Sequence, residues 1–211
     1  EFSSFRRMAD DKKGPYIKAV VVGDDDVGKT SFCITQAMGT FPDPHDHLGL
    51  ASYGDKFHCE VKKNGRTLKL SWWDTEAAQD FDNIRTSDYL KTNVFIVCFD
   101  IADPGSLDNV RTKWIPEIAN HCPGVPFILV GMKSDLRENE KIKQRLQERD
   151  LSPVTFDEGA RMTVEIGAAK YVECSSINNE IPVEDLFDVF AEVESCLKEK
   201  KKNEKKKCLM M

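Results

Sequence analysis

The sequence lacks the features of secreted and membrane-spanning chains. No apolar run reaches the roughly 18 residues of a transmembrane helix, and no stretch has the pattern of a signal peptide. The seven cysteines are odd in number and widely spaced, which argues against a disulfide framework, and the absence of a CxxC pair argues against structural zinc. Cys33 and Cys98 lie in apolar runs and are expected to be buried thiols. We therefore expect a cytoplasmic protein in a reducing compartment.

Charge is distributed unevenly along the chain. The formal net charge is −6, yet the segment Lys198–Lys207 holds seven lysines and two glutamates, which leaves −11 on the remainder. An acidic body makes nucleic acid a poor partner, whereas the basic segment suits an anionic membrane surface. A run of this kind is also typical of a plain solvated tail, and the run alone does not decide between the two.

The chain divides into one domain with two tails. Residues 1–15 have no apolar periodicity and are expected to be an extension or a disordered N-terminus, with Met8 as a plausible native start. Residues 16–197 are long enough for one buried core. Residues 198–211 form the basic tail.

Apolar runs alternate with helical patterns through the domain. Ile17–Gly23 is short and rich in β-branched residues, as in a strand buried on both faces, and a helix is expected from Gly28 to about Met38. Residues 57–63 and 66–74 are expected to pair as a hairpin. The pattern predicts an α/β fold with a mainly parallel, doubly wound sheet, one antiparallel edge strand and a surface helix inserted at about 137–150. Further strands are expected at 94–100, 125–131 and 170–176, and helices at 106–121, 156–167 and 183–200.

A phosphate-binding loop is predicted where the first strand meets its helix. Gly23, Gly28, Lys29 and Thr30 fit G-x-x-x-x-G-K-[ST], in which backbone N–H groups surround phosphates. Lys29 would reach the β- and γ-phosphates, and the Thr30 hydroxyl would bind Mg²⁺. A coincidental glycine-rich turn is disfavoured because a strand precedes the loop and a helix follows it. The residues expected at the phosphates are Asp25, Asp26, Val27, Gly28, Lys29, Thr30 and Ser31.

Three further motifs follow strand ends. Asp74 is placed to hold Mg²⁺ through water. In "GMKSDL", Asp135 could accept hydrogen bonds from the N1 and N2 edge of guanine, with Lys133 over the base plane. In "ECSS", Ser175 and Ser176 would lie at the base, with the Ser176 N–H meeting O6. These residues have no role in adenine recognition, so an ATPase is disfavoured.

Four such motifs in this order resemble the small GTP-binding proteins of the Ras superfamily, and more narrowly the Rho family. The narrower resemblance rests on the insert after "MKSDL", on "WDT" with Trp73, on "KYVECSS" and on the tail "KKKCLMM". The resemblance covers Ile17 to Met211. It implies a P-loop NTPase G domain with a six-stranded sheet and a Rho-type insert helix, binding GTP or GDP with Mg²⁺.

The same resemblance implies partners and a location. Exchange factors, effector proteins and a prenyl-binding dissociation inhibitor would bind a monomeric switch that regulates the actin cytoskeleton. Cys208 begins a prenylation box whose terminal Met211 favours farnesylation. One lipid binds weakly, so the lysines would act as the second signal for the cytoplasmic face of the plasma membrane.

The first effector loop departs from the family pattern. By the resemblance, Phe41 would stack edge-on against the guanine. The chain between Lys29 and Asp74 is longer than in the family, so the threonine that binds Mg²⁺ corresponds either to Ser52 or to Leu48, and Ser52 is favoured because the hairpin then stays in register.

Larger departures concern GTP hydrolysis. The family has glycine at the position of Asp25, because a side chain there crowds the γ-phosphate, the attacking water and an arginine finger; Asp26 adds a second carboxylate. In register, Ala77 stands at the γ-phosphate glycine, Ala78 at the catalytic glutamine and Met132 at the first residue of the guanine motif. Gln79 lies one residue late.

Three functions are consistent with these departures. The first is a Rho-type membrane-associated switch with strongly impaired GTP hydrolysis. The second is a pseudo-GTPase interaction scaffold with weak nucleotide binding. The third is an ordinary cycling GTPase that uses Gln79 as its catalytic residue.

Overall fold

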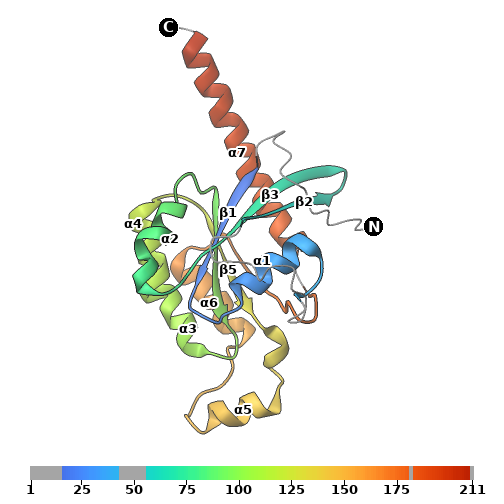
Figure 1. Ribbon diagram of the computed structural model, residues 1–211, viewed down its shortest axis with the longest axis vertical. Coiled ribbons are helices and arrows are strands. Elements are labelled where there is room, and N and C mark those ends of the chain that lie inside the picture. The colour runs from blue at the N-terminus through green and yellow to red at the C-terminus, as the bar shows by residue number, and fades with distance from the viewer. Residues whose placement is uncertain (1–15, 43–55, 181–182, 210–211) are drawn as a thin grey trace.

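The computed structural model describes residues 16–42, 56–180 and 183–209 (Figure 1). A six-stranded sheet runs through the centre in the order β2-β3-β1-β4-β5-β6, and all neighbouring strands are parallel except the β2–β3 hairpin at one edge. This confirms the predicted doubly wound sheet. The strands are β1 (Ile17–Gly23), β2 (Lys56–Lys63), β3 (Arg66–Asp74), β4 (Val94–Asp100), β5 (Phe127–Met132) and β6 (Lys170–Glu173).

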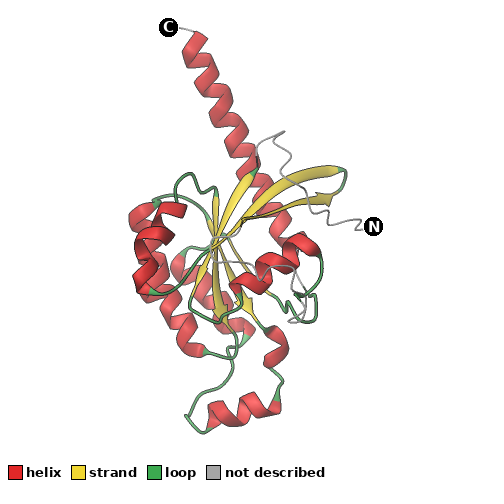
Figure 2. Ribbon diagram, in the orientation of Figure 1, coloured by secondary structure: helices red, strands yellow, loops and turns green. Residues whose placement is uncertain are grey.

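Helices cover both faces of the sheet (Figure 2). On one face, α1 and α7 pack on a core that includes Phe32, Trp72 and Phe190. On the other, α3, η2, α4 and α6 enclose a second core around Trp114. The helices are α1 (Lys29–Met38), α2 (Asp82–Asp88), α3 (Pro104–Asn109), α4 (Ile115–His121), α5 (Glu140–Gln147), α6 (Phe156–Ile166) and α7 (Val183–Leu209). Shorter turns are η1 (Gln79–Phe81), the π-helical turn η2 (Val110–Trp114) and η3 (Ser134–Leu136).

The buried thiols and the inserted helix predicted from the sequence are both found in the structure. Cys33 and Cys98 are both buried and free. Helix α5 lies within the predicted insert, begins at the N-cap Asn139 and buries Leu146 beneath it.

The helix expected over residues 106–121 is divided by η2. Pro116 lacks the N–H that an α-helix needs, and its ring would clash with the carbonyl of Thr112. The chain widens at this point, and the Ile115 N–H donates to the Val110 carbonyl, five residues earlier. Strand limits also differ by a few residues: β5 begins at Phe127 and β6 ends at Glu173.

Helix α7 continues beyond its expected end at residue 200 and projects from the body of the domain (Figure 1). Lysine and glutamate are good helix formers, and no glycine or proline follows Val183, so the basic segment extends the helix to Leu209. Among the described helices, none is long and apolar enough to span a bilayer.

Candidate nucleotide-binding site

The phosphate-binding loop connects β1 to α1 in a conformation that needs its glycines. Gly23 has φ 151°, and a Cβ there would lie 2.4 Å from the backbone oxygen of Cys98 on β4. Gly28 has φ 104° and caps α1. Lys29 is buried, and its Nζ donates to the Asp24 carbonyl at 2.7 Å, so the side chain folds back over the loop.

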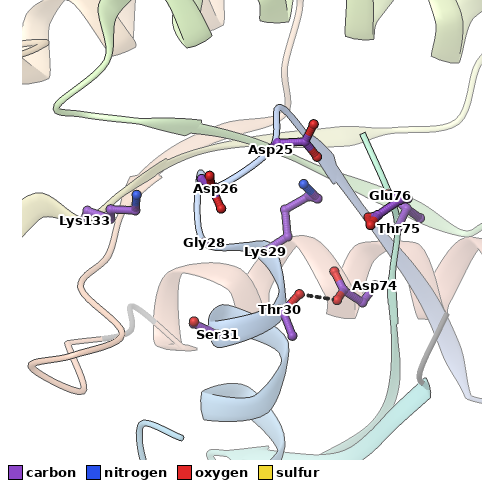
Figure 3. Close-up of a pocket in the computed structure, with 10 residues that line it drawn as sticks. All are labelled: Asp25, Asp26, Gly28, Lys29, Thr30, Ser31, Asp74, Thr75, Glu76 and Lys133. Atoms are coloured by element: carbon purple, nitrogen blue, oxygen red, sulfur yellow. Dashed lines mark hydrogen bonds between the residues drawn. The ribbon is translucent and has the colours of Figure 1, made fainter. Parts of the chain in front are cut away.

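The loop faces a polar cavity of about 510 Å³ (Figure 3). Seven residues of the predicted phosphate and metal sites line it, and Thr75, Glu76 and Lys133 complete the wall. The predicted residues that it brings together are Asp25, Asp26, Gly28, Lys29, Thr30, Ser31 and Asp74. Val27 is buried below the loop and lines a neighbouring cavity.

Thr30 and Asp74 meet at the floor of this cavity (Figure 3). The Thr30 hydroxyl donates to Asp74 Oδ2 at 2.5 Å, whereas Asp74 Oδ1 is buried and has no hydrogen-bond partner. Burial raises the pKa of Asp74, against the hydrogen bond from Thr30 and the charge of Lys29. A hydroxyl beside an unsatisfied carboxylate oxygen fits a magnesium ion, because hard cations prefer oxygen ligands.

The three consecutive aspartates of the loop face different surroundings. Asp24 turns away from the cavity: the Trp114 indole Nε1 donates to its Oδ1 at 2.8 Å, and Asn109 Nδ2 donates to its Oδ2 at 2.6 Å. Asp25 and Asp26 are exposed and line the cavity. Asp26 has φ 60°, a left-handed conformation that aspartate tolerates better than most residues.

A second cavity of about 230 Å³ adjoins the first and shares Gly28, Ser31 and Lys133 with it. Its walls are largely apolar and suit a planar ring. Four of the five residues predicted at guanine line it, namely Phe41, Lys133, Asp135 and Ser176, together with Val27, Met132, Leu136 and Ile177.

Ser175, the fifth predicted residue, lies behind the wall. It is fully buried, and its hydroxyl donates to Asp135 Oδ1 at 2.5 Å. The Asn178 N–H in turn donates to the Ser175 oxygen at 3.2 Å. Ser175 therefore orients the Asp135 carboxylate instead of lining the cavity.

Lys133 has a partner that sequence reasoning missed. Its Nζ forms an ion pair with Asp100 Oδ2 at 2.8 Å, and a Cβ on Gly28 would lie 3.8 Å from Lys133 Cε, so the Lys133 stem crosses the phosphate loop. The available signal was a carboxylate at the end of β4, the same position that Asp74 has on β3.

The predicted hydrolysis residues follow Glu76. Ala77 is buried, and its methyl group belongs to the core around Trp114, so it is directed away from the phosphate cavity. Gln79 begins η1, is exposed and is not among the residues that line the cavity. The backbone here is held by Arg85 and Lys113, which sequence reasoning also missed.

Two predicted sites lie partly or wholly outside the described residues. Ser52, and the alternative Leu48, fall between residues 43 and 55, which the structure does not describe. Cys208 lies in the last turn of α7, and its side chain is not among those described.

Comparison with known proteins agrees with this architecture. The Ras family model matches residues 18–195. The chain is 38% identical over 194 residues to "GTP-binding protein RHO1" of Candida albicans, covering 92% of this chain and 95% of that protein. It is 37% identical over 199 residues to "GTP-binding protein rho5" of Schizosaccharomyces pombe, covering 92% and 96%.

The strand order, the phosphate loop and the adjoining cavities are those of a P-loop nucleotide-binding domain. With the matches above, the chain belongs to the Ras family, as a small GTPase of the Rho family.

Proposed function

We propose that this protein is a Rho-type molecular switch that binds GTP and GDP with Mg²⁺ and hydrolyses GTP very slowly. The observation that carries the proposal is the pair of adjoining cavities, one polar with Lys29, Thr30 and Asp74, the other largely apolar with Asp135 at its wall. Their shapes and chemistry suit a triphosphate joined to a planar base.

Binding would use groups that already point into these cavities. Backbone N–H groups from residues 25–31 surround the phosphates, and Lys29 Nζ exchanges the Asp24 carbonyl for phosphate oxygens. Thr30 and Asp74 would hold Mg²⁺, which neutralises phosphate charge when bound. Asp135, oriented by Ser175, accepts hydrogen bonds from the guanine edge.

Slow hydrolysis follows from what surrounds the γ-phosphate space. Asp25 places an exposed carboxylate in the cavity wall, where it would repel the γ-phosphate and crowd the attacking water. It would also obstruct an arginine finger, which is worth ~10³–10⁵ in rate. Ala78 has no side-chain amide to orient water, and Gln79 is not among the residues that line the cavity.

The location and partners belong to the same proposal. Prenylated Cys208 and the lysines of α7 would hold the protein at the cytoplasmic face of an anionic membrane. Exchange factors, effectors and a prenyl-binding dissociation inhibitor would act on it, with actin regulation as the output expected of a Rho-type protein.

A pseudo-GTPase scaffold is the alternative, favoured by the two exposed carboxylates of Asp25 and Asp26 at the cavity and by Met132 in the guanine motif. Extraction of nucleotide from the purified full-length protein separates the two. Stoichiometric guanine nucleotide is expected, and its absence favours the scaffold.

Single-turnover hydrolysis by the GTP-loaded protein tests the slow rate. We expect turnover well below that of an ordinary Rho-type GTPase measured in parallel. A rate equal to that protein's would overturn the claim of impaired hydrolysis and leave nucleotide binding intact.

A further inference from the structure

Three consecutive carbonyl groups beside the phosphate cavity are held by two cationic side chains. Arg85 Nη1 donates to the Glu76 carbonyl at 2.9 Å and to the Ala78 carbonyl at 3.4 Å. Lys113 Nζ donates to the Ala77 carbonyl between them at 3.0 Å. The backbone of residues 76–78 is thus held by side chains of the protein itself.

Arg85 is itself held rigidly. Its side chain is completely buried and donates to both carboxylate oxygens of Glu117 on α4, at 3.0 and 2.7 Å. The Tyr89 hydroxyl also donates to Glu117, at 2.5 Å. Burial alone would raise the pKa of Glu117, but these hydrogen bonds lower it overall, so the carboxylate is ionised at neutral pH. Arg85 also lies 5.1 Å from the centroid of the Trp114 ring.

The π-helical turn η2 contacts both the phosphate loop and residues 76–78 through two neighbouring side chains. Lys113 contacts the Ala77 carbonyl, and Trp114 donates to the Asp24 carboxylate of the phosphate loop at 2.8 Å. Lys113 Nζ lies 4.2 Å from the centroid of the Trp114 ring, so the two side chains support each other. The wide turn imposed by Pro116 therefore joins the phosphate loop to residues 76–78.

The planar geometry of the peptide bond determines where the N–H groups of this segment point. In a trans peptide the C=O and the following N–H point to opposite sides, and the described residues contain no cis peptide. Anchoring the Glu76 carbonyl on Arg85 directs the Ala77 N–H away from Arg85. Thr75 and Glu76 line the phosphate cavity directly before Ala77, whose methyl group is buried in the core.

We propose that Lys113 and Arg85 are positioning residues that hold the N–H groups of Ala77 and Ala78 toward the γ-phosphate and so select GTP over GDP. The inference rests on the proposed function, because it presupposes that guanine nucleotides bind. Only the triphosphate has a group at this end of the cavity, so the two contacts act on GTP and leave GDP unaffected. The contacts of Lys113 and Arg85 preorganise residues 76–78, so binding does not have to order this segment at an entropic cost.

The test compares GDP with a non-hydrolysable GTP analogue on the full-length protein. Lys113→Met keeps the aliphatic stem and removes the ammonium group. It is expected to weaken the binding of the analogue by about tenfold, because one charged hydrogen bond is lost, and to leave the affinity for GDP unchanged. Lys113→Arg keeps a donor within reach and should restore the wild-type ratio. Lys141→Met, the same change at an exposed position of α5, is the matched control and should alter neither affinity.

Each remaining outcome counts against the inference in its own way. If Lys113→Met weakens GDP and the analogue equally, Lys113 has a structural role only. If it changes neither, the contact with Ala77 does not position the γ-phosphate. If the wild-type protein binds neither nucleotide, the proposed function falls as well. Thermal denaturation of each variant verifies that the fold is retained.

Discussion

At the scale of single residues, the aspartates of the phosphate loop differ in what they would do to a bound nucleotide. Asp24 is bound by Trp114 and Asn109 and adds no carboxylate to the cavity. Asp25 and Asp26 do place carboxylates at the cavity, and each close pair of a carboxylate and a phosphate costs on the order of 1 kcal/mol when solvated. That cost is small beside the affinity expected of such a site, so we expect it to weaken nucleotide binding without preventing it.

Asp74→Asn is predicted to stabilise the metal-free protein. Because the pKa of Asp74 is raised by burial, the folded protein binds a proton more readily than the unfolded chain, and its stability falls as the pH rises through the carboxyl range. Removing the charge should raise the melting temperature at pH 7 in EDTA by about 2–4 °C, the shift that 1 kcal/mol gives in a chain of this size.

The same Asp74→Asn change should abolish the dependence of nucleotide affinity on Mg²⁺. Asp188→Asn serves as the control, because Asp188 is an exposed carboxylate on α7 that pairs with Lys63 of β2. If Asp74→Asn instead lowers the melting temperature in EDTA, the Asp74 carboxylate stabilises the metal-free fold. That result would contradict the destabilisation expected from its buried, unpartnered oxygen.

Asp135→Ala is predicted to weaken the binding of guanine nucleotides on the order of 100-fold, because two hydrogen bonds from the base to a charged acceptor are lost. Ser175→Ala should have a smaller effect, since Ser175 only orients the carboxylate. Dissociation of a fluorescent GDP analogue measures both. An unchanged rate for Asp135→Ala would remove Asp135 from the base site.

At the scale of elements, the strands and the phosphate loop were predictable. Runs such as Ile17–Gly23 and Val94–Asp100 are buried on both faces, so their apolar pattern is continuous and unambiguous. The division of residues 106–121 by η2 could have been anticipated from Pro116, although the choice of a π-helical turn depends on the packing of Val110 and Trp114. The extension of α7 was missed because a charged run is typical of both helix and solvated tail.

We expect the position of η1 to determine which residue can orient water, and Ala78→Gln tests this. Gln79 begins η1 outside the cavity lining, whereas Ala78 directly precedes the turn. Restoring a glutamine at position 78 is expected to raise the single-turnover rate on the order of 100-fold, the gain that correct placement of a reactant supplies.

The companion variant Gln79→Ala should leave hydrolysis at its low starting rate. If Gln79→Ala instead abolishes turnover, the protein is an ordinary cycling GTPase that uses Gln79. Both rates are measured on GTP-loaded protein after removal of free nucleotide.

At the scale of the whole molecule, contacts between distant segments were beyond sequence reasoning. Trp114 lies 90 residues from Asp24, and Lys133 lies 33 residues from Asp100. Each residue alone has an ordinary interpretation, the first as core and the second as a base-stacking lysine. Their pairing depends on which strand ends meet, and this is fixed by the order of the sheet. Most residues that line the two cavities could be predicted from the motifs, whereas the partners Trp114 and Asp100 could not.

Cys208→Ser is predicted to release the protein from membranes, because the lysines alone supply only a weak, salt-sensitive attraction. Cys196→Ser is the matched control, since Cys196 is an exposed cysteine on the same helix. Membrane and soluble fractions from cells that express each variant are compared. Unchanged fractionation of Cys208→Ser would exclude lipidation as the anchor.

The length of α7 divides the basic segment according to its distance from a bilayer. A helix rises 1.5 Å per residue, so a lipid on Cys208 would place Lys205, Lys206 and Lys207 within about 5 Å of the membrane surface if α7 stands upright. Lys198 would then lie about 15 Å away, beyond the ~8 Å over which charges act at physiological salt. The first four lysines of the segment would then act as a spacer that holds the domain clear of the lipid, and the last three alone would act as its electrostatic contact.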